Sequence, residues 1–517
     1  MREPTGRDGG GYSPGGRPQG PRDGRSGPPR SGPSRAGGPR SGPPRSGGPR
    51  SDRPGFGPPR GPGARPAAPV DAARATALRG LAHQAETFPQ LDIAPLPTDD
   101  LSPRDAAFAH AIYDATLRRW LTLSYLLQGF MERRLSELES PVIAALLGGA
   151  AQMLLLDRVP PHAALNESVE WVKVAARPTA AGLVNAVLRR LAELVYHGPR
   201  SRNEYGDARL PVWSGARNEI PLSDGSAALL AGDVLPEDDL ERLAAATSHS
   251  RDLIARWGVA FGQDEARRLA AHGLVVPPTI LNTAFAKDLD ALPLRPHATP
   301  GHHVFTGTRP ELLALLGSRR DLWVQDAAST RAVASVADLA PGLVIDLCAG
   351  QGTKTRQLEA TFPDARIVAT DVDARRLASL QTLAAGSDGR IEVEAMGDIG
   401  RNYTATADLV LLDVPCSNTG VLPRRVEARY RCDAEQMKRL VELQRTIVAD
   451  AMRLLRPGGA ILYSTCSIDR EENEDQAEWA ARGGLASERT HRAMPAGLPG
   501  EDPAGYQDGS FSVLLRP

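Results

Sequence analysis

Cysteine is scarce in this 517-residue chain, and its four cysteines are Cys348, Cys416, Cys432 and Cys466. Because no two of them form a Cys-x-x-Cys pair, and four are too few for a disulfide framework, we expect neither disulfides nor a bound metal. Long apolar runs are missing as well. The most apolar stretch, residues 141–156, contains a glutamine and is shorter than the ~20 residues that cross a bilayer, so it predicts a buried helix.

The first residues of the chain contain no apolar core of a signal peptide, so secretion by that route is not expected. The length suggests about three domains at roughly 150 residues each. Together these observations favour a soluble, cytoplasmic protein of several domains that has no membrane partner.

Residues 1–68 lack what a folded domain needs. Their apolar residues are only Met1, Tyr12, Phe56 and four alanines, while 19 glycines and 16 prolines are concentrated there. Thirteen arginines against four acids give this segment a charge of +9, which the whole-chain value of −1 conceals. We predict a disordered arm. Its arginines, at every fifth position from Arg25 to Arg50, suit salt-sensitive contact with phosphates, and a solubilising tail is the alternative.

Alanine- and leucine-rich helical patterns fill residues 69–197. In residues 180–194, six apolar side chains fall within an arc of roughly 140° on a helical projection. Ser102 followed by Pro103 is typical of a helix start. This part predicts an all-α domain. Its outer arginines could bind RNA, although solvated helix faces have the same composition.

The next two segments are shorter. Residues 198–248 are rich in Gly, Pro, Ser and acids and show no long periodic signal, so we expect an extended linker. In residues 249–330 a helical pattern runs from Ser250 to Ala271 and a short strand begins near Pro277. This segment predicts a small α/β subdomain that packs against the C-terminal part of the chain.

From Gly342 onward the pattern alternates between strands and helices. The expected strands are residues 343–347, 366–371, 407–413 and 459–465, the last after a helix that ends near Pro457-Gly458. Apolar strands that alternate with helices are typical of parallel sheets covered on both faces. We therefore predict, over residues 331–517, an α/β Rossmann-like domain with a parallel, doubly wound sheet.

A loop with two glycines, Cys-Ala-Gly-Gln-Gly-Thr-Lys at residues 348–354, follows the first of these strands. Gly350 and Gly352 allow the backbone to turn sharply and to approach a ligand. Asp371 ends the second strand, where its carboxylate can accept hydrogen bonds from both ribose hydroxyls. A dinucleotide and S-adenosylmethionine would both fit, because both contain adenosine, and a plain strand-to-helix turn is the alternative. A phosphate P-loop is excluded, because its two required glycines are replaced by Thr353, directly before Lys354, and by Cys348, five positions earlier.

Two cysteines and an aspartate lie at the ends of later strands. Asp413 and Cys416 come at the end of one, in Asp-Val-Pro-Cys-Ser, and Cys466 comes at the end of another, in Ser-Thr-Cys-Ser. Ligands of such sheets bind beyond the carboxyl ends of the strands, so these groups can converge on one crevice. A lone buried cysteine is usually a small apolar residue. Two cysteines beside a nucleotide loop instead favour a chemical role.

Methylation of cytosine would use two cysteines. Carbon 5 of cytosine is too weak a nucleophile to take a methyl group directly, and a thiolate that adds to carbon 6 makes carbon 5 nucleophilic. A second cysteine can then assist the loss of the carbon-5 hydrogen and the expulsion of the first thiol. A carboxylate near the ring, for which Asp413 is the candidate, can favour its electron-poor, protonated form.

These motifs resemble the RNA cytosine-C5 methyltransferases. Asp-Val-Pro-Cys-Ser and Ser-Thr-Cys-Ser-Ile-Asp-Arg-Glu-Glu-Asn carry the resemblance, together with Trp323–Ser329 and Asp508–Phe511. The helical part resembles the NusB-like RNA-binding domain of the branch that acts on bacterial small-subunit (16S) ribosomal RNA, in Leu101–Asp105, Asp157–Glu167 and Gly182–Arg190. The resemblance covers most of residues 70–517, outside the 198–248 segment.

The resemblance implies a role for each matching residue. Cys466 would be the nucleophile, Cys416 would assist release, and Asp413 would act beside the target base. S-adenosylmethionine would be bound by Cys348, Ala349, Gly350, Gln351, Gly352, Thr353, Lys354, Asp371, Asp398 and Asp413. A solvated loop acid is the alternative for Asp398, and Cys432 is expected to be structural.

The resemblance also implies the partner, ribosomal RNA, and we expect a monomer. The family usually has Ala-Pro-Gly-Gly-Lys where this chain has Gly350–Lys354. Two alternatives therefore stay open. One is an RNA-binding ribosome-assembly factor with impaired catalysis, and the other is a tRNA cytosine-C5 methyltransferase, which the NusB-like domain makes less favourable.

Overall fold

The structure is a computed structural model that describes residues 70–157, 159–196 and 209–517. The predicted arm, residues 1–68, lies outside the described residues. No described helix combines the length and apolar character that crossing a membrane requires.

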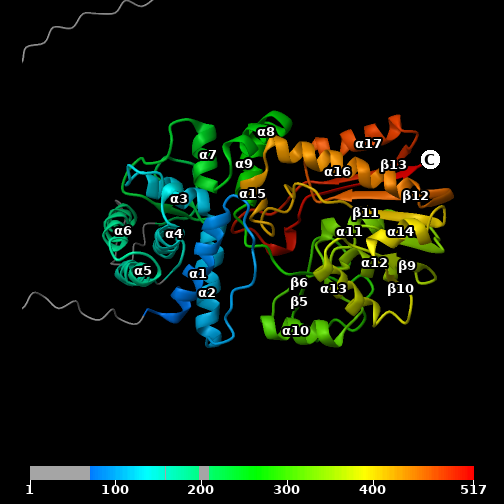
Figure 1. Cartoon of the computed structure of the whole chain (residues 1–517), viewed down its shortest axis with the longest axis horizontal. Coiled ribbons are helices and arrows are strands. Elements are labelled where there is room, and N and C mark those ends of the chain that lie inside the picture. Colours follow the sequence, from blue (N-terminus) through cyan, green and yellow to red (C-terminus); the bar gives the residue numbers. More distant parts are fainter. Residues whose placement is uncertain (1–69, 158, 197–208) are drawn as a thin grey trace, which may run out of the picture. The chain divides into compact units, whose positions relative to one another are not determined.

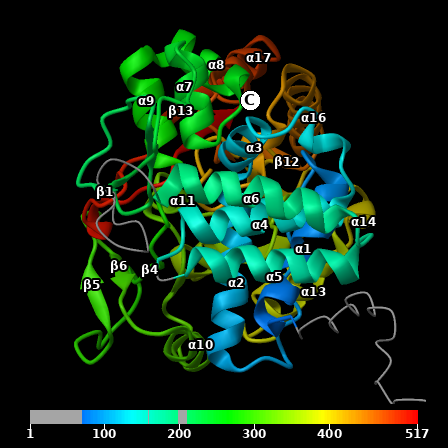
Figure 2. The same cartoon turned by 90° about the vertical axis from the view of Figure 1, so that its left-hand side faces the viewer.

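The N-terminal part is a helical domain, as the periodicity predicts. Its elements are α1 Ala72–Thr87, α2 Pro103–Arg118, α3 Trp120–Gln128, η1 Leu135–Glu137, α4 Ser140–Leu154, α5 Pro161–Ala175 and α6 Ala180–Tyr196. Helix α4 contains residues 141–154 of the apolar stretch and is buried along almost its whole length. It contacts both α5 and α6, and the three helices lie together in Figure 2. Ser102 caps α2, accepting a hydrogen bond from the Asp105 N–H.

The segment expected to be an extended linker is structured from residue 209 onward. It forms a three-stranded antiparallel sheet, in the order β1-β3-β2, followed by α7 (Asp239–Thr247). The strands are β1 Arg209–Leu210, β2 Glu219–Pro221 and β3 Ala227–Leu229. Ile220, Leu222, Leu230 and Leu235 pack into the core of the helical domain. The prediction was wrong here because strands of two or three residues are too short to produce a periodic pattern.

The expected small subdomain is an α/β unit. It comprises α8 Arg251–Phe261, α9 Gln263–His272, β4 Ile280–Asn282, β5 Leu294–Pro296, β6 His302–Phe305, α10 Arg309–Ser318 and β7 Trp323–Val324. The strands form an antiparallel sheet in the order β5-β6-β4-β7. The single expected helix is two helices, because Gly262 has a φ of 89° and breaks it.

The C-terminal domain contains a seven-stranded sheet in the order β10-β9-β8-β11-β12-β14-β13. The strands are β8 Leu343–Asp346, β9 Arg366–Ala369, β10 Ile391–Val393, β11 Ala407–Asp413, β12 Leu455–Thr465, β13 Ala486–Ala493 and β14 Ser510–Arg516. The helices are α11 Ala327–Ala334, α12 Thr353–Thr361, α13 Ala374–Ala384, α14 Met396–Asn402, α15 Ala428–Arg431, α16 Ala434–Met452 and α17 Glu474–Arg482. Two short turns, η2 Arg470–Glu472 and η3 Pro503–Gly505, complete it.

Two apolar layers enclose this sheet. Helices α11, α12 and α13 pack on one face, and α14, α16 and α17 pack on the other (Figure 1). Alternate residues of each central strand point to opposite layers, as Val344 and Ile345 do in β8. The doubly wound α/β prediction is thereby confirmed.

The sheet is mixed rather than wholly parallel. Strands β10, β9, β8, β11 and β12 are parallel, whereas β14 is antiparallel to β12 and to β13. Strand β13 has no apolar pattern by which it could be predicted, because its residues before Ala493 are all exposed and, except for Ala486, polar. The helix expected to end near Pro457-Gly458 ends at Met452, and both residues lie within β12, where a register shift accommodates them.

Candidate active site

The predicted catalytic residues follow two adjacent parallel strands. Asp413, the last residue of β11, is paired in register with Ser464 of β12. Because the strands are parallel, the loops that leave their carboxyl ends start side by side. The Cys416 loop and the Cys466 loop therefore face each other across 50 residues of sequence.

The two cysteines are in direct contact. Their sulfurs are 3.2 Å apart, and both thiols are free. The Cys466 thiol also donates to Oδ1 of Asn418, at 3.3 Å. Asn418 adopts the left-handed conformation, with a φ of 61°, and its Nδ2 donates to the Cys416 carbonyl at 2.8 Å. One asparagine therefore connects both cysteines.

The electrostatics of the two sulfurs differ. The hydrogen bond with Cys466, burial and the charge of Glu472 raise the pKa of the Cys416 thiol well above its usual value. Lys354 lies near Cys466. Burial lowers the pKa of Lys354, but the nearby Asp413 and the Cys466 sulfur raise it by more. The net pKa is therefore above its usual value, and the side chain is an ammonium group. The two sulfurs therefore lie near opposite charges, Cys466 near the Lys354 ammonium group and Cys416 near the Glu472 carboxylate.

Asp413 holds two neighbours at the strand end. Its Oδ2 accepts from Lys354 Nζ and its Oδ1 accepts from Ser464 Oγ, both at 2.8 Å. Lys354 comes from the first turn of α12, so this ion pair connects the glycine loop to the cysteine loops. The structure thus brings Lys354, Asp413, Cys416 and Cys466 into one cluster.

The glycine loop closes against β9. Gly350 N donates to Asp371 Oδ2 at 2.9 Å, which places this carboxylate beside the loop. Gly350 and Gly352 have φ values of 58° and 88°, as an abrupt turn into α12 requires. A Cβ on Gly350 would have no atom within 4 Å, so this side of the loop is open.

Asp346, the last residue of β8, completes the cluster although the sequence assigned it no role. It is fully buried, and its Oδ2 accepts from Thr355 Oγ1 at 2.7 Å. Its Oδ1 has no hydrogen-bond partner within the described part of the chain. Burial raises its pKa to about 7. An orphaned acceptor beside an open glycine loop is a feature that a bound cation or amine would satisfy.

Two predicted site residues, Asp398 and Cys348, make fewer contacts with the cluster. Asp398 lies in the first turn of α14 and pairs with Arg401 of the same helix at 3.3 Å; within residues 209–517 no hydrogen bond joins it to another predicted site residue. Cys348 is half-buried, and burial together with neighbouring carboxylates raises its pKa, so its thiol stays neutral. Among the described residues, no cluster of His, Cys, Asp or Glu could hold a metal ion.

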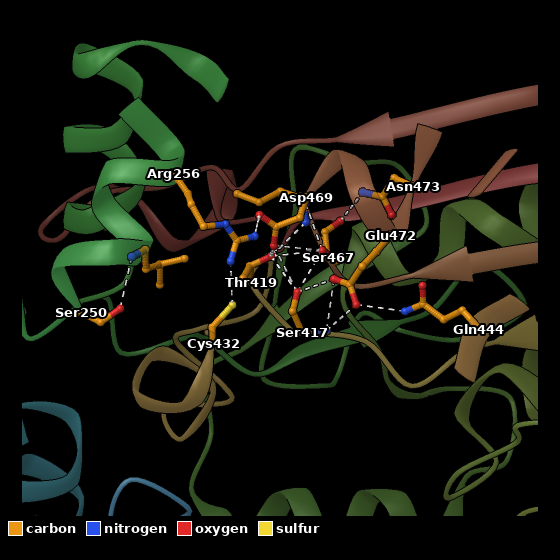
Figure 3. A network of polar contacts seen from close by, with 12 residues as sticks. Ser250, Arg256, Ser417, Thr419, Cys432, Gln444, Ser467, Asp469, Glu472 and Asn473 are labelled. Carbon is orange, nitrogen blue, oxygen red and sulfur yellow. Dashed lines mark hydrogen bonds and ion pairs between the residues drawn. The ribbon is translucent and has the colours of Figure 1, made fainter. Parts of the chain in front are cut away.

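A network of polar side chains joins Ser417 and Ser467, the residues that directly follow Cys416 and Cys466 (Figure 3). It contains Ser417, Thr419, Gln444, Ser467, Asp469, Glu472 and Asn473, and it includes Arg256 from α8 and Cys432. Arg256 Nη2 donates to Asp469 Oδ1 at 2.7 Å, and its Nη1 donates to Cys432 Sγ at 3.3 Å. Burial raises the Cys432 pKa to about 11, so this cysteine is a neutral acceptor.

Sequence reasoning missed several of these residues. Asn418, Ser464 and Glu472 lie within or beside the two cysteine motifs, so their closeness in sequence to Cys416 and Cys466 could have marked them as site residues. Arg256 lies in another subdomain, 213 residues before Asp469, and no local pattern marks it.

Known proteins match both halves of the chain. Residues 338–497 match the family model "16S rRNA methyltransferase RsmB/F", and residues 71–193 match the NusB family. A ribosomal RNA small subunit methyltransferase B from Xanthomonas campestris is 31% identical over 383 residues, which are 73% of this chain and 79% of that protein. The chain belongs to the RsmB/F family of 16S rRNA methyltransferases.

Other comparisons agree with this membership of the RsmB/F family. A protein of the same name from Vibrio cholerae is 29% identical and covers 79% of this chain and 87% of its own length. The crystal structure of PH0851 has a TM-score of 0.63 at 19% identity, over 86% of this chain and 99% of that one, and shows the same fold. The predicted family and its NusB-like helical domain are thereby confirmed.

The RsmB/F family implies S-adenosylmethionine as the methyl donor, and the residues present fit this group. Asp371 lies beside the glycine loop, where a carboxylate can accept from ribose hydroxyls. The open side of Gly350 leaves room for a ligand.

Proposed function

We propose that this protein methylates carbon 5 of a cytosine in 16S ribosomal RNA through a covalent bond between Cys466 and carbon 6. The contact between the two sulfurs, at the ends of adjacent parallel strands and beside Lys354–Asp413, carries this proposal. Bound at residues 348–354 with Asp371, Asp398 and Asp413, S-adenosylmethionine supplies an electrophilic methyl group.

Cys466 acts as the nucleophile. The ammonium group of Lys354 lies near the sulfur that attacks as a thiolate, while the raised pKa of Cys416 keeps that thiol protonated. The thiolate adds to carbon 6, and the electron pair of the C5=C6 bond becomes available at carbon 5. Asp413, fixed by Ser464 and Lys354, lies where its charge can stabilise the electron-poor, protonated ring.

Cys416 acts in the second half of the reaction. The addition of Cys466 to carbon 6 removes the hydrogen bond and the charge of Cys466 that raised the pKa of Cys416, so Cys416 loses its proton more readily than before. The Cys416 thiolate takes the proton from carbon 5 of the methylated ring. The electron pair of that C–H bond re-forms the C5=C6 bond, and Cys466 leaves as a thiolate.

Two cysteine variants test this proposal. With RNA and S-adenosylmethionine, Cys416→Ala should accumulate a protein–RNA adduct that resists denaturation, because addition proceeds and release does not. Cys466→Ala should give neither adduct nor methylated RNA. A Cys466→Ala protein that methylates at the normal rate would show that the roles are wrong.

The same adduct distinguishes the alternative functions. Sequencing the attached RNA would identify the target cytosine and separate a ribosomal substrate from tRNA. If wild-type protein shows no rise in melting temperature with S-adenosylmethionine, the ribosome-assembly factor with impaired catalysis is favoured.

A further inference from the structure

Glu472 is fully buried next to the cysteine loops. Its Oε1 accepts from the backbone N–H of Ser417 and from Gln444 Nε2, both at 2.9 Å, and its Oε2 accepts from Ser417 Oγ. Ser417 directly follows Cys416, so this carboxylate holds the backbone of the Cys416 loop (Figure 3).

Glu472 is itself held close to the segment that contains Cys466. Glu472 is the last residue of η2, and the next residue, Asn473, donates from Nδ2 to the Ser467 carbonyl at 2.9 Å. Thr465 Oγ1 donates to Asn473 Oδ1 at 2.6 Å. Asn473 thus binds the residues on both sides of Cys466, and Glu472 spans from there to the other cysteine loop.

In the part of the chain that the structure describes, no ion pair with a cation offsets the cost of burying the Glu472 carboxylate. Within the described residues, the arginine of the network pairs with Asp469 instead, and no ion pair is formed by Glu472. Burying a carboxylate without a cation is costly, and three hydrogen-bond donors offset that cost only partly. An amide at this position could accept the Ser417 N–H without this cost.

We propose that Glu472 is a positioning residue that holds Cys416 against Cys466 for the release of the RNA adduct. This inference rests on the proposed function. Loss of the Glu472 carboxylate frees the Cys416 loop, whereas Cys466 keeps its contacts with the segment around Asn473 and its nucleophilic role. The expected defect is slow release, not slow addition.

The test is adduct accumulation in a protein that retains both cysteines. Glu472→Ala should accumulate the denaturation-resistant adduct at least about tenfold above wild type, with multiple turnover about tenfold slower and the first methyl transfer within about threefold of wild type. Glu472→Gln should stay near wild type, because its Oε1 still accepts the Ser417 N–H. Glu471→Ala changes an exposed neighbour in η2 and serves as the matched control.

If Glu472→Ala only destabilised the fold, addition and methylation would fall together and no adduct would accumulate. That result would overturn the proposal. A Glu472→Gln protein as impaired as Glu472→Ala would also overturn it, because charge rather than position would then matter. If Glu472→Ala does not fold, Gln444→Leu removes a donor to both Glu472 and the Pro415 carbonyl and should accumulate adduct to a smaller extent. Wild-type adduct levels in that variant would contradict the proposal.

Cys416→Ala in the same assay separates the two proposals. If Cys416→Ala accumulates no adduct, the proposed chemistry fails. If Cys416→Ala accumulates adduct and Glu472→Ala does not, only the role of Glu472 fails.

Discussion

At the end of β8, a single carboxyl group combines complete burial with incomplete hydrogen bonding. Asp346 receives one hydrogen bond, from Thr355, and burial raises its pKa to about 7. An unfolded chain would protonate this group only near pH 4. Between these values the folded protein holds the proton more tightly, so the group's stabilising effect is complete below pH 4 and is lost as the pH rises through 7.

The pH dependence of unfolding tests this assignment. As the pH rises from 5 to 8, we expect Asp346 to lower the free energy of unfolding of the wild-type protein by at most about 3 kcal/mol, because about two pH units separate pH 5 from its folded pKa. Asp346→Asn cannot ionise and should show a flatter dependence of melting temperature on pH. Asp364→Asn, at an exposed position, is the control and should follow the wild type. An Asp346→Asn protein with the wild-type pH dependence would refute the assignment.

Strands β11 and β12 bring the two cysteine loops side by side, and a glycine allows the loops to approach closely. Gly420 N donates to the Cys466 carbonyl at 2.9 Å, and its own carbonyl accepts from Gly509 N at 2.7 Å. A Cβ at Gly420 would lie 2.6 Å from the Cys466 oxygen and 2.8 Å from the Gly509 oxygen. Both atoms belong to the backbone, which cannot yield as a flexible side chain can.

Gly420→Ala should therefore push the Cys466 loop away from the Cys416 loop. We expect a loss of stability of about 1–3 kcal/mol and a fall in methylation rate of about tenfold or more. Unfolding in urea and a methyl-transfer assay would measure the two effects. Gly400→Ala, in α14, where an added Cβ has no atom within 4 Å, is the matched control. Equal effects of the two substitutions would show that close packing at Gly420 is unimportant.

At the scale of the whole molecule, buried arginines join parts of the chain that are distant in sequence. Arg429, in α15, is fully buried and donates to the carbonyls of Arg118, Gly273 and Leu422. The first two carbonyls lie at the carboxyl ends of α2 and α9, where helices carry partial negative charge. One side chain thus connects the helical domain, the small subdomain and the loop that follows Cys416.

Arg429→Ala should uncouple these three parts. The substitution leaves three buried carbonyls without donors and creates a cavity, so we expect a loss of about 3 kcal/mol or more in the free energy of unfolding. Arg439→Ala, at an exposed position of α16, is the control. Urea unfolding would measure both variants, and a change below about 1 kcal/mol for Arg429→Ala would contradict this role.

Charge is distributed unevenly along the chain. Residues 1–68 have a charge of +9 and the rest of the chain −10. An Arg-rich arm attached to an acidic body can increase the encounter rate and the non-specific affinity for RNA.

Deletion of residues 1–68 should weaken RNA binding most at low salt and leave the affinity for S-adenosylmethionine unchanged. Binding isotherms at several salt concentrations would measure this effect. Equal RNA affinity at low salt with and without the arm would favour the solubilising-tail interpretation.

The amino-acid sequence alone predicted the helical domain, the α/β domain and the family. Each of these depends on signals that are contiguous in the chain: the periodicity of residues 180–194, the apolar strand of residues 407–413, and the short motifs around Cys416 and Cys466. Local signals of this kind reflect which face of an element is buried, so they can be read without knowing the partner.

Only the tertiary structure decided which residues meet. The three-stranded sheet of residues 209–229 and the antiparallel β13 had no readable pattern, because short or exposed strands lack an apolar period. The contact between the Cys416 and Cys466 sulfurs, the link from Glu472 to Ser417 and the reach of Arg256 to Asp469 join residues 50, 55 and 213 positions apart. Such contacts depend on strand order and register, which the chain acquires only when the sheet forms.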